Sequence, residues 1–194
     1  MSATSDMIGV ILAGGRSSRM GVDKATYAVA GRPMIDWVVD ALSRACHRVV
    51  VAGRYEAPAG LESIPDEGDG PQGPLAGLVS CLRHFPSESL IVVAVDQPWL
   101  RTDTVKRLGE LAGDLPVVPV EGGVRQTTCA LYPPGVADAG ETELKTGGSL
   151  QSLLDVVAFA PVVDWHEWGE DGRSWFSVDT PQAAEEGLAR FGPP

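Results

Sequence analysis

Short apolar runs alternate with segments of helical periodicity through the first two thirds of the chain. Residues 7–13 (MIGVILA) form an apolar run that ends at two glycines, which is typical of a strand buried on both faces. From Met34 to Ala45 apolar residues recur at helical spacing, and Pro33 stands where a helix can begin. The pattern therefore predicts a buried strand, a long connection and then an amphipathic helix.

The same alternation continues along the chain. We expect further strands at 48–52, 89–95, 117–120, 127–132, 160–165 and 175–178. We expect further helices at 75–82, 102–111 and 150–154, and another after Pro181, with caps at Thr102, Ser149 and Thr180. Strands that alternate with helices predict an α/β fold, with a three-layer, mostly parallel sheet and helices on both faces.

Such a fold determines where a ligand binds. Right-handed crossovers place the loops that follow the strands at one edge of the sheet, and ligands bind beyond that edge. The loop after residues 7–13, the carboxylate of Asp96 and that of Asp179 are therefore expected to converge. No repeat or linker divides the sequence, so we expect one domain over residues 1–194.

The loop after the first strand combines glycines with cations. Gly14 and Gly15 allow the backbone to approach an anion, so that N–H groups can point at phosphate oxygens. The guanidinium groups of Arg16 and Arg19 can each bind a phosphate through two hydrogen bonds, and Lys24 adds a compact positive charge. The loop does not contain the GxxxxGK[ST] pattern of a P-loop. It predicts a grip on a triphosphate, and the alternative is a solvated strand–helix connection.

Composition narrows the function classes. The 194-residue chain has a net charge of −11, which argues against a uniformly basic face and against a nucleic-acid partner. Three cysteines without a CxxC pattern indicate neither a disulfide framework nor a zinc cluster, so we expect buried thiols. No apolar run has transmembrane length and residues 1–7 lack a signal core. We therefore expect a cytoplasmic protein without a membrane partner.

Two carboxylates end strands at the expected binding edge. Mg²⁺ takes oxygen ligands and usually combines one or two carboxylates with phosphate and water. Asp96 ends the apolar run LIVVAV, and Asp179 follows WFSV. We expect Asp96 to bind Mg²⁺ and Asp179 to be a second, less secure ligand. The alternative for both is a turn or capping residue before a proline-containing segment.

A third group of small residues surrounds another acid. Asp66, Gly73 and Gly77 lie in and after the segment PDEGDGPQGPLAGL, where a carboxylate could accept hydrogen bonds from guanine or ribose. The alternative is a flexible loop. Residues 68–73 also match GxGxxG, but Pro71 removes an N–H donor from that motif. A dinucleotide-binding dehydrogenase is therefore disfavoured.

The string LAGGRSSRMGVDKA at 12–25 resembles the LAGGxSxRMGxDKA signature of the molybdenum cofactor guanylyltransferases. The segments PDEGDGPQGPLAGL at 65–78, VDQPWL at 95–100 and FSVDTPQ at 176–182 resemble further segments of that family. The likeness is weak at 133–174. It implies a GT-A-like nucleotidyltransferase with a Rossmann-like sheet, whose nucleotide-binding part is about 7–100 and whose acceptor-binding part is about 101–194.

The resemblance also assigns roles. Leu12, Ala13 and Gly14 would contact the nucleotide through the backbone, and Asp66, Gly73 and Gly77 would border its base or ribose. Gly15, Arg16, Arg19 and Lys24 would hold the phosphates, and Asp96 would bind Mg²⁺; Arg19, Lys24 and Asp96 would be the catalytic residues. Some relatives have an asparagine where this chain has Gly53. Residues 125–127, with Lys145 and Ser149, would border the acceptor.

The implied reaction is the attack of an acceptor phosphate on the α-phosphorus of GTP, with release of pyrophosphate. The implied acceptor is molybdopterin or its molybdenum form, and the product is the guanine dinucleotide cofactor. We expect a monomer whose partners include other cofactor-biosynthesis proteins and apo-molybdoenzymes. One alternative is a cytidylyltransferase for molybdopterin or a transferase for another phosphorylated metabolite. Another is a non-catalytic nucleotide-binding module that delivers cofactor.

Overall fold

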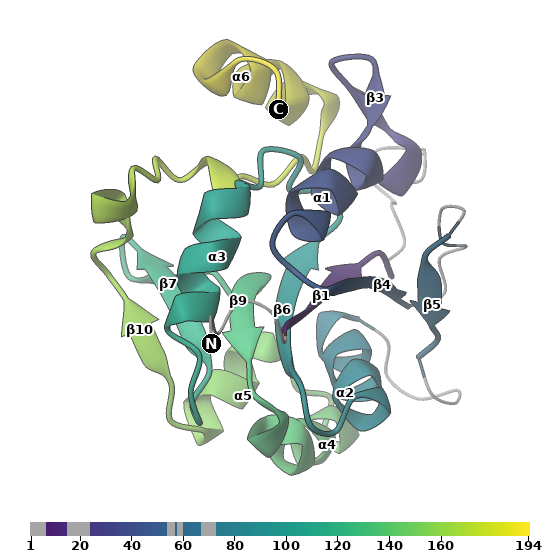
Figure 1. The fold of residues 1–194 in the computed structure, drawn as a ribbon, viewed down its shortest axis with the longest axis vertical. Helices are drawn as coiled ribbons and strands as arrows, with labels where there is room; N and C mark the ends of the chain where they lie inside the picture. Colours follow the sequence, from purple (N-terminus) through teal and green to yellow (C-terminus); the bar gives the residue numbers. More distant parts are fainter. Residues whose placement is uncertain (1–6, 15–23, 54–56, 58–59, 67–72) are drawn as a thin grey trace.

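The chain folds around a mixed sheet of eight strands, shown in the computed structural model of Figure 1. The structure describes residues 7–14, 24–53, 57, 60–66 and 73–194. The strand order is β10-β7-β9-β6-β1-β4-β5, and β8 pairs with β7. The strands are β1 (Met7–Leu12), β4 (Arg48–Ala52), β5 (Glu62–Ile64), β6 (Ser89–Ala94), β7 (Val117–Glu121), β8 (Val124–Arg125), β9 (Cys129–Tyr132) and β10 (Ala160–Val162).

The sheet is mostly parallel, as predicted. Strand β1 pairs in parallel with both β4 and β6, and the pairs β4–β5 and β7–β10 are also parallel. Strand β9 runs antiparallel to both of its neighbours, β6 and β7. The carboxyl ends of β1, β4 and β6 therefore meet at one edge of the sheet.

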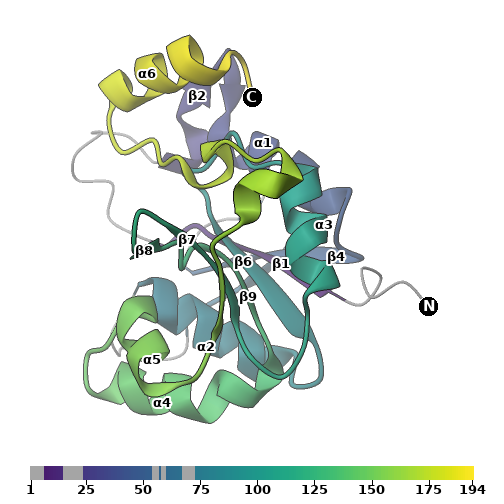
Figure 2. The same cartoon turned by 90° about the vertical axis from the view of Figure 1, so that its left-hand side faces the viewer.

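Helices cover both faces of the sheet (Figure 2). In β1, Met7 and Ile11 pack with α1 (Met34–Ser43) and α3 (Thr102–Glu110), whereas Ile8 and Val10 face the layer of α2 (Pro74–His84), α4 (Ala137–Lys145) and α5 (Leu150–Val156). This division follows the two-residue period of a strand, and all six residues of β1 are buried. The predicted three-layer α/β fold is confirmed.

A smaller apolar cluster lies beyond the carboxyl edge. The hairpin of β2 (Ala28–Val29) and β3 (Arg32–Pro33) and the last helix, α6 (Pro181–Phe191), meet around Trp99. They lie together at the top of Figures 1 and 2. The indole of Trp99 donates to the Gly192 carbonyl at 2.7 Å. The end of the chain is thereby fixed against the loop that follows β6.

Several local predictions are confirmed and others are wrong. Ser149 and Thr180 cap α5 and α6 through their hydroxyls, as expected. Thr102 does not cap α3, because its hydroxyl donates to the Ala41 carbonyl at 3.1 Å. The strand predicted at 175–178 is absent, and the 3-10 helix η5 (Arg173–Trp175) precedes an extended segment there.

Other elements were not predicted or are shorter than predicted. The hairpin β2–β3 is too short to show an alternating pattern, and α4 lies in the segment 133–174, for which no helix was predicted before residue 150. The strand expected at 160–165 ends at Val162, and the 3-10 helix η4 (Trp165–Trp168) follows. The 3-10 helix η3 (Pro134–Val136) leads into α4. These differences leave the order of the main elements unchanged.

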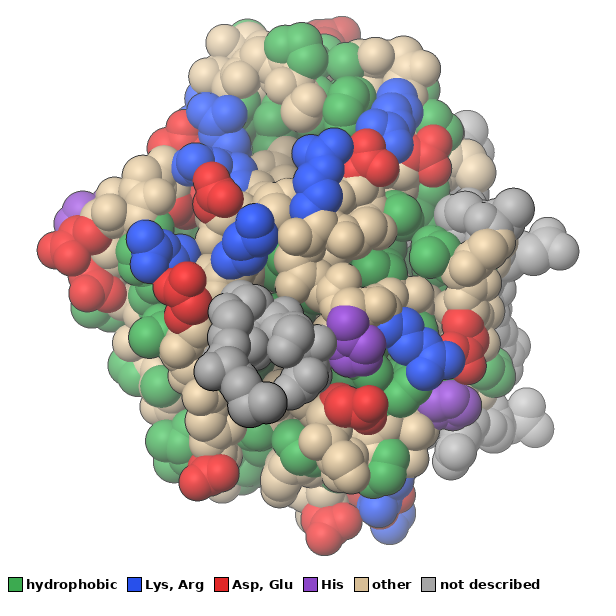
Figure 3. All heavy atoms as spheres, in the orientation of Figure 1, with side chains coloured by type: hydrophobic (Ala, Val, Ile, Leu, Met, Phe, Trp, Pro, Cys, Tyr) green, Lys and Arg blue, Asp and Glu red, His purple; other side chains and the backbone are tan. Residues whose placement is uncertain are grey.

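The three cysteines are buried thiols, as expected from the sequence. All three cysteines are free and buried, and burial raises the pKa of the Cys46 and Cys81 thiols to about 12. On the face shown in Figure 3, acidic and basic side chains are interspersed. In the part of the chain that the structure describes, no helix has the length and apolarity that a membrane crossing requires.

Candidate active site

Asp96 lies at the carboxyl edge because β1 and β6 end side by side. Leu12 pairs with Ala94 in the sheet, and the Val95 amide donates to the Leu12 carbonyl at 3.1 Å. Asp96 comes directly after Val95, in the turn that follows β6, and its side chain is 13% exposed. The carboxylate is thus held at the edge where ligands of such sheets bind.

Lys24 reaches this carboxylate from a different part of the chain. It opens the 3-10 helix η2 (Lys24–Thr26), whose next residue, Ala25, is fully buried in the core. The ammonium Nζ donates to Asp96 Oδ2 at 2.6 Å and also to Asp179 Oδ1. A single cation therefore bridges two carboxylates that are far apart in sequence.

Asp179 is held close to Asp96 by the backbone. The Val178 amide donates to the Asp96 carbonyl at 2.8 Å, and the Val178 side chain is fully buried. Directly after Asp179, the Thr180 hydroxyl accepts from the Ala183 amide and caps α6. Asp96, Asp179 and the end of the first loop converge as expected, although Asp179 follows an extended segment and not the predicted strand. We call the side chains of Lys24, Asp96 and Asp179 the charged corner.

The charged corner shifts the titration of its lysine. Partial burial by itself would lower the pKa of Lys24. The hydrogen bonds and charges of Asp179 and Asp96 together outweigh burial and raise that pKa above its usual range. Lys24 is therefore a full positive charge at neutral pH. Its side chain is 24% exposed, so it is partly open to solvent.

A second group of predicted residues lies at the ends of β1 and β4. Gly53 has a φ of +104°, and a Cβ atom there would lie 2.8 Å from the Cα of Gly14. A Cβ on Gly77 would lie 2.9 Å from a Leu12 methyl and 3.9 Å from Asp66 Oδ1. These glycines allow two loops and the start of α2 to close around the Asp66 carboxylate.

The backbone groups of the first loop differ in what they already bind. The Leu12 carbonyl and the Ala13 amide make sheet-type hydrogen bonds, the latter to Ala52 at 3.1 Å. Within the described residues no hydrogen bond uses the Gly14 amide. Gly73 precedes α2 with a φ of +134°. The predicted phosphate-binding residues Gly15, Arg16 and Arg19 lie outside the described residues.

A pocket of about 280 Å³ opens beside this edge. It is lined by Gly73, Pro74, Leu75, Ala76, Thr127, Thr128, Leu144, Gly148, Ser149, Leu150 and Gln151. Two of the predicted acceptor residues, Thr127 and Ser149, are among them. Arg125 instead binds Gln151 and Asp155, and Lys145 does not line the pocket.

The pocket adjoins the charged corner through Thr128. The Ala94 amide donates to the Thr128 carbonyl at 3.1 Å, and Ala94 is two residues before Asp96. Thr127 is 8% exposed, and its hydroxyl makes no hydrogen bond within the described residues. The pocket therefore contains an available hydroxyl and borders the end of β6, the strand that precedes Asp96.

One buried acidic cluster escaped the sequence analysis. Glu170 is 4% exposed, and its carboxylate accepts from the hydroxyls of Thr104 and Ser174 and from the amides of Asp171 and Gly172. The sequence carries no signal for this cluster, because Glu170 stands in the irregular segment between η4 and η5. We call Glu170 with these partners the buried clamp.

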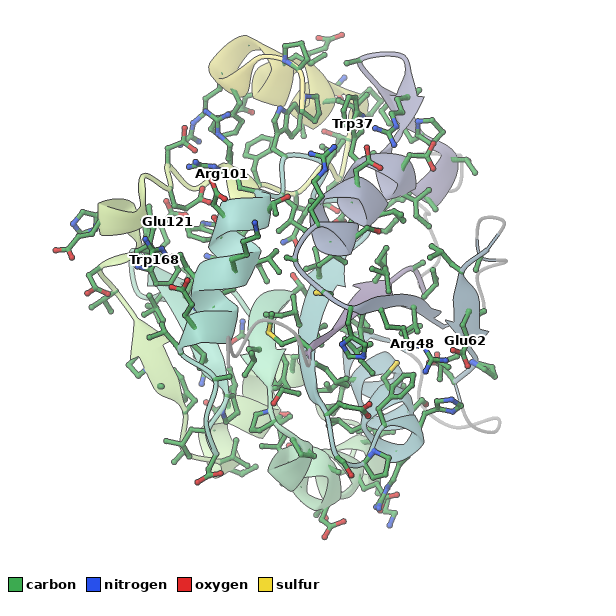
Figure 4. All side chains as sticks on the ribbon, in the orientation of Figure 1. Trp37, Arg48, Glu62, Arg101, Glu121 and Trp168 are labelled. Atoms are coloured by element: carbon green, nitrogen blue, oxygen red, sulfur yellow. The ribbon has the colours of Figure 1, made fainter. Side chains whose placement is uncertain are left out.

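The aromatic residues near the C-terminus pack against one another and against the sheet. The rings of Trp165 and Trp175 meet edge to face at 5.0 Å, and their indoles donate to the Val120 carbonyl and to Glu121. Figure 4 labels Glu121 and Trp168 at this end of the sheet. It also shows the ion pair of Arg48 with Glu62, which joins β4 to β5 at the opposite edge.

Fold and site together define an α/β protein with Lys24, Asp96 and Asp179 gathered at the carboxyl edge of its sheet. The family model of the MobA-like NTP transferase domain matches residues 9–164, and the chain belongs to this family. It is therefore a nucleotidyltransferase.

Relatives of known name and a solved structure support this family assignment. The chain is 35% identical over 141 residues to a molybdenum cofactor guanylyltransferase of Cereibacter sphaeroides, covering 68% of this chain and 72% of that protein. It is 31% identical over 192 residues to one of Sinorhizobium fredii, covering 91% and 88%. Molybdopterin-guanine dinucleotide biosynthesis protein A of Archaeoglobus fulgidus superposes with a TM-score of 0.77 at 26% identity, covering 94% of this chain and 97% of that one.

Proposed function

We propose that the protein transfers GMP from GTP to molybdopterin or its molybdenum form and releases pyrophosphate. The observation that carries the proposal is the charged corner, where Lys24 and two carboxylates converge beside the end of β1. The choice of acceptor and of guanine as the nucleobase rests on relatives with the name molybdenum cofactor guanylyltransferase, one of which is similar over 91% of this chain.

Asp96 and Asp179 fit a magnesium ion. Both carboxylates already bind one shared cation, the Lys24 ammonium, so their oxygens converge on a single position. Mg²⁺ needs only one or two carboxylates when substrate phosphates and water complete its shell. The described residues contain no group of three or more His, Cys, Asp or Glu side chains that could hold a metal alone. The donor set is thus suited to a metal that arrives with phosphate.

The remaining chemistry is positioning and neutralisation of charge. Mg²⁺ held by Asp96 and Asp179 would neutralise charge that develops on the leaving pyrophosphate. Lys24, Arg16 and Arg19 bind the phosphates in this proposal, and the Gly14 amide adds a neutral donor. An acceptor phosphate is ionised at neutral pH, so the reaction needs no general base. The protein holds the two substrates in line.

The Asp66 carboxylate is the proposed recognition group for guanine or its ribose. It lies beside Gly14 and Gly77, whose lack of side chains lets the backbone pack closely around this carboxylate. A carboxylate can accept two hydrogen bonds from the N1 and N2 edge of guanine, and cytosine offers no such pair. This difference favours GTP over CTP.

Melting temperatures with GTP, CTP, ATP and UTP, each with Mg²⁺, test the base. A ligand that binds only the native state raises the melting temperature by mass action, so GTP should stabilise most. Pyrophosphate release that depends on both molybdopterin and GTP then tests the transfer. Binding of GTP without turnover would instead support a delivery module, and a preference for CTP would contradict guanylyl transfer.

We propose that the pocket beside Thr128 takes part of the acceptor. Its apolar walls suit a flat ring, and the Thr127 hydroxyl is an available hydrogen-bonding group. Replacement Thr127→Val keeps the shape and removes the hydroxyl, which should raise KM for the acceptor about tenfold. KM for GTP should stay unchanged and serves as the internal control. Equal acceptor KM in variant and wild type would contradict this placement.

A further inference from the structure

The Lys24 ammonium stands in the position that a metal ion needs. It donates to Asp96 Oδ2 at 2.6 Å and to Asp179 Oδ1, the two acidic side chains that converge at this edge. Asp96 is 13% exposed, and Asp179 is fixed to it through the Val178 amide. One cation therefore occupies both carboxylates when no substrate is present.

An ammonium and a divalent metal cannot share these oxygens. Mg²⁺ binds oxygen at about 2.0–2.1 Å and requires lone pairs that the ammonium protons now engage. Two cations at this separation also repel each other, the more so because Asp96 is largely removed from solvent. Metal binding thus requires that Lys24 leave.

The local structure lets the side chain leave while the backbone stays. Ala25 is fully buried, the Tyr27 amide donates to the Lys24 carbonyl at 3.2 Å, and the Met34 amide donates to the Tyr27 carbonyl at 2.9 Å. The start of η2 is therefore anchored. The four-carbon stem of lysine is flexible and can move its ammonium to another anion without moving the chain.

We propose that Lys24 competes with the metal for Asp96 and Asp179, and that a bound triphosphate ends this competition by giving the ammonium a second anion. The metal alone then binds weakly, and metal and triphosphate bind with positive coupling. This rests on the proposed function only in naming the triphosphate. The same lysine blocks the metal position in the free protein and binds phosphate in the complex.

The test is a titration with Mn²⁺ alone, followed by the electron paramagnetic resonance signal of the free ion, in the absence of nucleotide. Lys24→Met keeps a flexible, unbranched side chain of similar size and removes its charge. We expect it to bind Mn²⁺ about tenfold more tightly than the wild type, as expected for the loss of two partly exposed ion pairs. Lys24→Gln provides a second variant with the same expected gain.

Lys106→Met is the matched control, because it makes the same substitution at an exposed position of α3. Its Mn²⁺ affinity should stay near that of the wild type, since distant exposed charges are screened. Adding Asp179→Asn to Lys24→Met should reverse the gain.

Equal affinity in wild type and Lys24→Met, binding too weak to measure in both, or an equal gain in Lys106→Met would overturn the proposal. Because no nucleotide is present, the titration keeps its meaning even if the protein transfers no GMP. Failure of the proposed function would appear only in the assay with GTP and molybdopterin.

Discussion

The charged corner and the buried clamp are both built around carboxylates, yet their surroundings differ. Glu170 in the clamp is 4% exposed and accepts from hydroxyls and backbone amides of its own and a neighbouring element. In the charged corner the side chain of Asp96 is 13% exposed and that of Asp179 is 55% exposed. In the described structure the hydrogen-bond partner of both side chains is the ammonium of a flexible lysine.

This difference separates a structural carboxylate from a functional one. The donors of Glu170 belong to the fold, so moving them would break α3 or the segment before η5. The donor in the charged corner is a mobile side chain that another cation can replace. If burial were the only criterion, the buried clamp would be chosen as the functional site. An exchangeable partner at the carboxyl edge of the sheet points to the corner.

The largest expected effect is on catalysis by the charged corner. Asp96→Asn removes the negative charge that binds Lys24 and, in the proposed function, Mg²⁺. The kcat for pyrophosphate release should fall about 10³-fold, as for loss of a main electrostatic group. The melting temperature should remain close to that of the wild type, because a partly exposed ion pair contributes little to stability.

Asp114→Asn makes the same change at an exposed site between α3 and β7 and should leave turnover unchanged. Near-normal turnover of Asp96→Asn would contradict the assignment of Asp96 as a ligand of Mg²⁺. A large loss of stability would show that Asp96 resembles Glu170.

The next effect is on stability and comes from the clamp. Glu170→Ala leaves buried amides and hydroxyls without an acceptor, which should reduce the free energy of unfolding by about 3 kcal/mol. For a chain of this length, that corresponds to a fall in melting temperature of roughly 8 °C. The kcat of the folded protein should fall far less than in Asp96→Asn.

Glu167→Ala, three residues earlier and exposed, controls for loss of an acidic residue in this segment and should melt like the wild type. If Glu170→Ala melted normally but lost turnover, the clamp would act in catalysis and the distinction between the two clusters would fail.

The sequence predicts the fold well where a strand or helix has a clear period. Buried strands such as β1 and β6 were found from continuous apolar runs, and the caps of α5 and α6 from Ser149 and Thr180. The segment at 175–178 was misread because Trp175 and Val178 are buried in two different clusters rather than on one strand. A run of apolar residues does not specify which surface each one contacts.

The candidate site was likewise predicted from the sequence only in part. The proximity of Asp96 to the end of β1 follows from topology, since β1 and β6 are parallel neighbours. Asp179 is instead brought there by the extended segment after η5, whose Val178 amide donates to the Asp96 carbonyl. The direct contact of Lys24 with both carboxylates depends on side-chain conformations, which no motif encodes. The close approach of Gly53 to Gly14 was also missed, although a glycine directly after β4 is a signal for it. These contacts depend on long-range packing, which a local sequence pattern does not specify.

The smallest expected effect concerns the geometry within the clamp. The Ser174 hydroxyl donates to Glu170 and accepts from the Arg101 amide at 3.1 Å, and Ser174 is fully buried. Ser174→Ala removes both bonds but leaves Glu170 its other donors. We expect a loss of about 1 kcal/mol in the free energy of unfolding, or roughly 3 °C in melting temperature, with unchanged turnover.

Ser177 supplies the comparison within the same segment. Its hydroxyl makes no hydrogen bond within the described residues, so Ser177→Ala should not change the melting temperature. A graded loss, large for Glu170→Ala, small for Ser174→Ala and absent for Ser177→Ala, is what a carboxylate with several fixed donors requires. Equal losses of stability for Ser174→Ala and Ser177→Ala would mean that aromatic contacts hold the segment. The hydrogen-bond donors of Glu170 would then be as exchangeable as the donor of Asp179.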